Sequence, residues 1–166
     1  PAVTAEQLSA MDVEKDLEKA KAASYELYAA KKTLDDADEA YEDSGARDNY
    51  VATNYKKVQA RHTWQAAQYT YNATVQSYEL SFRSLYDSVK GCAQILTSAQ
   101  TSLAVKRADL ETAQLKYDQG SISENALHTA EDDLYAAQDT VTGAEHDLFT
   151  AYNNYRWAVE NGLINS

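Results

Sequence analysis

Residues 82–103 read FRSLYDSVKGCAQILTSAQTSL, and their apolar side chains recur at alternating steps of three and four residues. The positions that follow this pattern are Phe82, Leu85, Val89, Cys92, Leu96, Ala99 and Leu103. Such a heptad spacing is typical of an α-helix that buries one stripe of side chains against neighbouring helices. The stretch therefore predicts an all-α fold of long antiparallel helices packed as coiled coils.

The same stripe of apolar positions, which we call the seam, continues in both directions. It runs back through Ala60, Trp64, Ala67, Tyr71, Thr74 and Tyr78, and forward through Lys106, Leu110, Ala113 and Tyr117. We therefore expect one helix of roughly 65–70 residues that starts near Tyr50, on the order of 100 Å long. Gly91 lies inside it, and a single glycine costs a helix only about 1 kcal/mol relative to alanine. The alternative is a tight reversal at Lys90-Gly91-Cys92, which would give an up-down four-helix bundle.

A further helix is expected on each side of the long one. The first starts near Ala5, after a capping box at residues 4–7, and ends near Asp43, where residues 44–49 read as a turn. The last follows Gly120 and a capping box at residues 121–124, and it ends at Asn161-Gly162. Their seams are Ala20, Ala23, Leu27, Ala30, Leu34, Ala37 and Tyr41 in the first helix, and Ala130, Leu134, Ala137, Val141, Ala144, Leu148, Tyr152, Tyr155 and Val159 in the last.

The chain is interpreted as a single helical domain made of two hairpin repeats, about 8–90 and 92–161. Seam residues before the two turns match at a constant offset, as in Leu27 with Leu103 and Tyr41 with Tyr117. After the turns, the two series of seam spacings are the same. The alternative is that any two heptad helices can be aligned in this way.

Composition excludes several classes of protein. The net charge of −11 in 166 residues disfavours nucleic acids and anionic membrane surfaces as partners, because their phosphates would repel the chain. The longest stretch without charged residues, 62–78, is too polar and too short to cross a bilayer. Cys92 is the only cysteine, so no disulfide within the chain is possible. A chain that begins Pro1-Ala2-Val3 is expected to be a mature or excised fragment.

Around the second turn the sequence resembles the TolC-like outer-membrane efflux protein family, from about residue 75 to 163. The matching residues form the pattern Leu110-x-x-Ala113-x-x-x-Tyr117-x-x-Gly120-x-Ile122-Ser123, followed by Leu127, Ala130, Leu134, Ala137, Ala144, Asp147, Leu148, Ala151, Tyr152 and Gly162. Upstream, the residues that fit the long helix of that family are Val75, Leu85, Tyr86, Val89, Leu96, Ala99 and Leu103.

The resemblance implies a helical component of a cell-envelope efflux or secretion system, on the extracytoplasmic side and assembled as a homo-oligomer. It also implies a docking site for an adaptor protein at the second helical tip, which consists of Gln119, Gly120, Ser121 and Ile122. We expect Gly120 to have a positive φ, Ser121 to cap the following helix and Ile122 to be partly exposed. The alternative is that Ile122 only staples the turn to the helix ends.

This sequence departs from the family in one respect, since it contains no alternating strands of the length that a β-barrel requires. We therefore do not expect it to form an outer-membrane pore by itself. A second hypothesis is a structural or adaptor coiled coil that mediates protein–protein interaction without a transport role.

No motif points to an enzyme or to a bound cofactor. There is no glycine-rich phosphate loop, no nucleophile motif and no cluster of metal ligands. His128 and His146 share a helix face but are too far apart to share a metal, and, with His62, they are interpreted as exposed residues beside the seam. The acidic run at residues 35–43 is interpreted as a solvated face. The 13 tyrosines suit partly exposed interfaces or packing within the chain, and both interpretations stay open.

Overall fold

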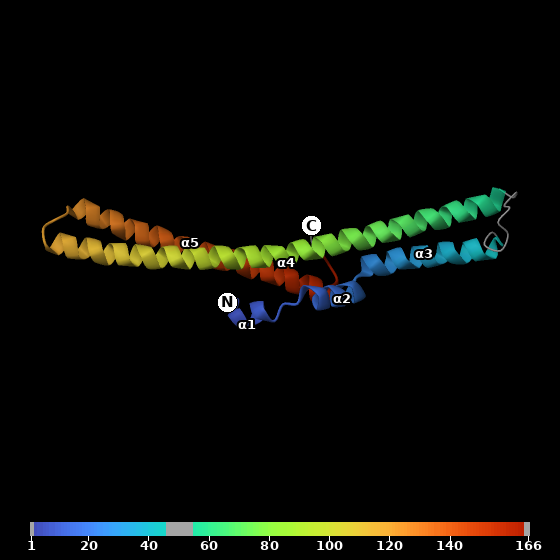
Figure 1. Cartoon of the computed structure of the whole chain (residues 1–166), viewed down its shortest axis with the longest axis horizontal. Coiled ribbons are helices and arrows are strands. Elements are labelled where there is room, and N and C mark those ends of the chain that lie inside the picture. Colours follow the sequence, from blue (N-terminus) through green and yellow to red (C-terminus); the bar gives the residue numbers. More distant parts are fainter. Residues whose placement is uncertain (1, 46–54, 165–166) are drawn as a thin grey trace. The chain divides into compact units, whose positions relative to one another are not determined.

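The computed structural model describes residues 2–45 and 55–164, and 89% of these are helical with no strand among them. The all-α prediction is therefore confirmed. The helices, coloured along the chain in Figure 1, are α1 (Ala5–Ser9), α2 (Val13–Ala23), α3 (Tyr25–Asp43), α4 (Tyr55–Asp118) and α5 (Glu124–Asn161). The predicted start near Tyr50 and most of the predicted first turn, 44–49, lie outside the described residues.

The long helix α4 is continuous through Gly91. Its 64 residues confirm the prediction of one uninterrupted helix, and the alternative reversal at Lys90-Gly91-Cys92 is wrong. The physical reason is that the apolar seam keeps its phase on both sides of Gly91, so the local cost of one glycine is small beside the loss of packing that a reversal would cause.

The chain forms two compact units, which we describe separately: unit 1 contains residues 2–11 and 85–155, and unit 2 contains 12–84 and 156–164. In unit 1, the C-terminal part of α4 turns at residues 119–123 and α5 runs back beside it (Figure 1). In unit 2, α2 and α3 lie along the N-terminal part of α4 (Figure 1). The two-repeat division of the chain stays a prediction.

The predicted seams follow the buried faces of these helices, except that Ala23 in the first seam is exposed. Every predicted seam position of α4 and α5 is buried or half-buried except Tyr117, which is 38% exposed. The most completely buried large side chains are Phe82 and Leu17 in unit 2 and Val89 and Leu148 in unit 1, and of these only Leu17 was not a predicted seam position. The heptad period therefore identified the packing face correctly, because side chains three and four positions apart lie on one side of a helix.

The predicted first helix is wrong in one respect, since three helices occupy its range. Its start is confirmed by a capping box in which Thr4 and Gln7 bond to each other's backbone N–H, and its end at Asp43 is confirmed. Asp12 caps α2 by accepting from the N–H groups of Glu14 and Lys15. These short-range caps compete with a continuous helix, and Asp and Ser side chains form them readily.

The second break lies at Ser24, which is 3% exposed. Its backbone is extended, with φ −76° and ψ 116°, and its side chain accepts from the N–H of Leu27 to start α3. The backbone of Gly162, just beyond α5, approaches closely here. A Cβ built on Gly162 would lie 2.3 Å from the Ser24 nitrogen and 2.5 Å from the Ala23 carbonyl carbon. This tertiary contact explains why a seam that looks continuous in sequence is interrupted at Ser24.

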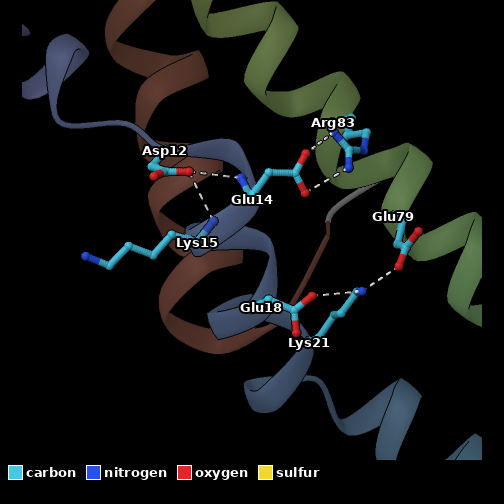
Figure 2. Close-up of polar contacts among 7 residues, drawn as sticks. All are labelled: Asp12, Glu14, Lys15, Glu18, Lys21, Glu79 and Arg83. Atoms are coloured by element: carbon cyan, nitrogen blue, oxygen red, sulfur yellow. Dashed lines mark hydrogen bonds and ion pairs between the residues drawn. The ribbon is translucent and has the colours of Figure 1, made fainter.

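Two ion-pair contacts join α2 to α4 within unit 2, and Figure 2 shows both. The guanidinium of Arg83 faces both carboxylate oxygens of Glu14, at 2.8 and 3.1 Å. The Lys21 ammonium lies 2.5 Å from a Glu79 oxygen and 3.1 Å from a Glu18 oxygen. The hydrogen bond with Glu79 is the main cause of a raised pKa at Lys21.

Candidate functional site

The second tip, Gln119–Ile122, is closed by backbone hydrogen bonds at the end of α4. Gly120 has φ +71°, so the predicted positive φ is confirmed. The N–H of Gly120 donates to the Tyr117 carbonyl at 2.8 Å, and the N–H of Ser121 donates to the Lys116 carbonyl at 2.8 Å. This pair of bonds around a left-handed glycine is a Schellman motif. It satisfies carbonyls that would otherwise be unpaired at the helix end and holds the turn in one conformation.

The start of α5 corrects one prediction at this tip. Ser123, and not Ser121, caps the helix, because its Oγ accepts from the N–H of Ala126 at 3.3 Å. The Ser123 carbonyl also accepts from Leu127 at 3.2 Å. Since the N–H of Ser121 already closes the turn, α5 begins later, at Glu124. Ser121 is then two residues too early for its hydroxyl to reach the third N–H of the helix, as an N-cap does.

The exposure of the tip agrees with the prediction for Ile122, which is half-buried. Gln119, Gly120 and Ser121 are exposed, and a Cβ added at Gly120 would meet nothing within 4 Å. On the preceding helical turn, Leu115 is 62% exposed and Tyr117 is 38% exposed. The tip therefore presents apolar side chains on a turn whose backbone is fixed.

Polar contacts hold the helices on either side of the tip. Lys106 of α4 and Asp133 of α5 form an ion pair at 2.7 Å, which raises the pKa of Lys106. The His128 Nδ1 lies 2.8 Å from a Glu131 oxygen, and this hydrogen bond raises the pKa of His128. Because these groups are exposed, each pair adds little stability by itself. The Lys106–Asp133 pair joins the two helices below the tip, whereas the His128–Glu131 pair lies within α5.

At the first tip only the beginning of the turn is described. Gly45 has φ +66°, its N–H donates to the Glu42 carbonyl at 2.8 Å, and its carbonyl accepts from the Lys57 ammonium at 3.2 Å. Within the acidic run of α3, Asp35 pairs with Lys31, and Asp36 with Lys32.

The remaining sequence candidates are not brought together into a site. Across residues 2–45 and 55–164, no group of three or more His, Cys, Asp or Glu side chains could hold a metal ion. His62 and His146 are exposed, and Cys92 is half-buried with a free thiol. None of the described helices is both long and apolar enough to cross a membrane.

The tyrosines divide between the two interpretations given above. Tyr25, Tyr55 and Tyr69 are each at least 74% exposed, as an interface residue would be. In contrast, Tyr41 is buried and stacks on Trp64 with ring centroids 5.1 Å apart. Tyr50 lies outside the described residues.

Sequence reasoning missed a buried polar contact at Tyr78. Its hydroxyl lies 3.0 Å from the Ala20 carbonyl oxygen and 3.1 Å from that of Gly162. Burial is the main cause of the raised pKa of Tyr78. Nothing in the heptad pattern distinguishes Tyr78 from the other seam tyrosines, so no sequence signal could have identified this contact.

Comparison of the chain with protein-family models, with curated proteins and with solved structures finds no match.

Proposed function

We propose that this protein is a non-enzymatic helical component of a cell-envelope efflux or secretion system, and that its second tip binds an adaptor protein. The observation that carries the proposal is the geometry of Gln119–Ile122. A Schellman motif fixes the turn, and Ile122, Tyr117 and Leu115 leave apolar surface exposed at or beside it. A rigid turn loses little conformational entropy on binding, so apolar contacts made there contribute efficiently to affinity.

The resemblance to TolC-like proteins supports the remaining parts of the proposal. It suggests a location on the extracytoplasmic side of the cell envelope and assembly as a homo-oligomer. Cell fractionation and sedimentation equilibrium of the purified chain test these two parts separately from the tip. A cytoplasmic location would contradict the export role whatever the tip binds.

The decisive experiment is Ile122→Asp at the tip. If the tip is a docking site, this change should abolish export while leaving the melting temperature nearly unchanged, because a charge replaces an apolar contact that only the partner completes. The matched control is Val105→Asp, which places the same charge at an exposed apolar position of α4 away from the tip; Val105 is 55% exposed. Export should survive this control.

A photocrosslinking residue at position 122 identifies the partner directly. In cells that perform export, it should capture the adaptor of the transport system, whereas the same residue at position 105 should not. If Ile122→Asp instead lowers the melting temperature by several degrees, or if export survives the charge, Ile122 staples the turn and the docking proposal is wrong.

A second candidate is a structural coiled coil that holds partners together without transport. The exposed tyrosines Tyr25, Tyr55 and Tyr69 in unit 2 favour it, since aromatic side chains are enriched in protein interfaces. This candidate predicts that changing these tyrosines to serine weakens partner binding while Ile122→Asp does not.

A further inference from the structure

An apolar groove lies in unit 1, well away in sequence from the tip. It is lined by Gly91, Gln94, Ile95, Ser98 and Ala99 of α4 and by Thr140 of α5, and its volume is about 550 Å³. The five α4 residues are spaced as one face of a helix, so the groove follows the helix surface over about two turns.

The groove exists because small residues leave it open. A Cβ added at Gly91 would meet nothing within 4 Å, so the backbone of α4 is accessible at this point of the groove. Ile95 is 61% exposed although it is large and apolar. A helix from another protein could therefore approach the backbone of α4 closely at Gly91 and cover Ile95, which is the geometry by which amphipathic helices fill apolar grooves.

The α5 side of the groove is acidic. Between Gln119 and Tyr155 the chain contains no Lys or Arg, and its carboxylates are Glu124, Glu131, Asp132, Asp133, Asp139, Glu145 and Asp147. Asp139 precedes Thr140 directly, and Asp87 is exposed one helical turn before Gly91. The cations of α4 in this unit are Lys90, Lys106, Arg107 and Lys116. Lys106 is paired with Asp133, and Lys90, next to Gly91, lies 5.5 Å from the centre of the Tyr86 ring.

We propose that this groove binds a basic amphipathic helix of a partner protein. The apolar stripe of the helix would cover Ile95 and fill the space beside Gly91, and Lys or Arg on its flanks would face the carboxylates. Such charge complementarity favours a basic partner and rejects an acidic one. A second copy of this chain as the occupant is the competing outcome that the test below distinguishes.

The groove proposal goes beyond the tip and does not depend on it. A partner could engage both surfaces, but each can fail without the other. Ile122→Asp should therefore leave binding at the groove unchanged, and this variant separates the two proposals experimentally.

The test uses the full chain and a synthetic helix as the probe. The probe is a fluorescent peptide of about 21 residues, six helical turns, with a Leu and Ala stripe on one face and Lys elsewhere. A second peptide carries Glu in place of every Lys on the same stripe. We expect fluorescence anisotropy to show binding of the Lys peptide, with an affinity that falls as the salt concentration is raised. The Glu peptide should not bind.

Two variants locate the binding site. A Cβ at Gly91 meets nothing within 4 Å and leucine is a better helix former than glycine, so Gly91→Leu should occupy the groove and keep or raise the melting temperature. It should nevertheless weaken binding of the Lys peptide by about tenfold or more, as should Ile95→Asp. The control Val105→Asp adds the same charge to another exposed apolar position of α4 and should bind like the wild type.

Three results would overturn the proposal. The first is equal binding of the Lys and Glu peptides, which would show that the groove does not select a basic partner. The second is wild-type binding by both Gly91→Leu and Ile95→Asp, which would place the peptide elsewhere. The third is self-association of the purified chain that Gly91→Leu abolishes, which would make a second copy the occupant.

Discussion

The hydroxyl of Tyr78 lies 3.1 Å from the carbonyl oxygen of Gly162, which is 84 residues later in the chain. The same hydroxyl lies 3.0 Å from the Ala20 carbonyl oxygen, and Tyr78 is only 4% exposed. One side chain of α4 thus faces backbone acceptors from α2 and from the residue that follows α5. A buried polar group destabilises the fold when it loses its partners. This contact therefore requires all three segments to keep their relative positions.

Tyr78→Phe should destabilise the protein by about 1–2 kcal/mol, because the phenylalanine ring keeps the packing but removes the buried donor. The matched control is Tyr69→Phe on the same helix. Tyr69 is 77% exposed, so its hydroxyl is free to bond with water and its removal should be nearly neutral. Thermal denaturation of both variants, followed by circular dichroism, makes the comparison. Equal melting temperatures would show that the Tyr78 hydroxyl contributes nothing.

Gly162→Ala should be severe, and Gly120→Ala should be mild. Both glycines have positive φ, +64° and +71°, which costs an alanine about 1 kcal/mol or slightly more. Only at Gly162 does the new Cβ also meet backbone atoms, 2.3 Å from the Ser24 nitrogen. We expect a loss of several kcal/mol at Gly162, measured by urea denaturation. Similar losses at the two sites would mean that the backbone contact with Ser24 is easily relieved.

Substitutions at Gly91 test the continuity of α4. Gly91→Pro should cost about 3 kcal/mol or more, because it removes a hydrogen bond in the interior of the helix and clashes with the preceding turn. Gly91→Ala should stabilise the helix by up to about 1 kcal/mol, since nothing lies within 4 Å of the new Cβ. The difference in melting temperature between these variants is the measurement. A tolerated proline would show that the helix is interrupted there.

The His128–Glu131 pair predicts a weak dependence of stability on pH. Because the hydrogen bond with Glu131 raises the folded-state pKa of His128, the pair stabilises the fold fully below the unfolded pKa of about 6.5. Its contribution is lost as the pH rises through the raised folded pKa. NMR titration should show that Glu131→Gln lowers the pKa of His128. An unchanged titration curve would mean that the contact at 2.8 Å does not persist in solution.

The heptad spacing by itself predicted the helical class of the chain and the buried face of α4 and α5, but not the breaks that divide the first predicted helix. Phe82, Val89 and Leu148 were predicted as seam residues and are among the most buried side chains. The end of α4 before Gly120 was also predictable, because few residues other than glycine adopt the left-handed conformation of a helix C-terminus. These features are local, since each depends only on residues within a few helical turns.

The capping residue of α5 was predicted incorrectly, because the heptad spacing does not locate the end of the preceding turn. Both Ser121 and Ser123 are chemically able to cap a helix, and the choice depends on where the Schellman turn ends. That end is set by the hydrogen bond from the Ser121 N–H to the Lys116 carbonyl, which a spacing rule does not contain. The groove at Gly91 was likewise not predicted, because the seam pattern gives the buried positions of each helix and not the positions beside them that the neighbouring helix leaves uncovered.

What the sequence alone determined is therefore the period: α-helices throughout the described residues, a long helix that passes through Gly91, and a buried seam. Only the tertiary structure decided where the helical period is interrupted and which distant segments of the chain the helices contact. The break at Ser24, the need for glycine at position 162 and the partners of Tyr78 all come from one contact among segments distant in the chain. The physical reason is that helical periodicity follows from bonds between near neighbours, whereas a contact across more than 50 residues depends on how whole helices pack.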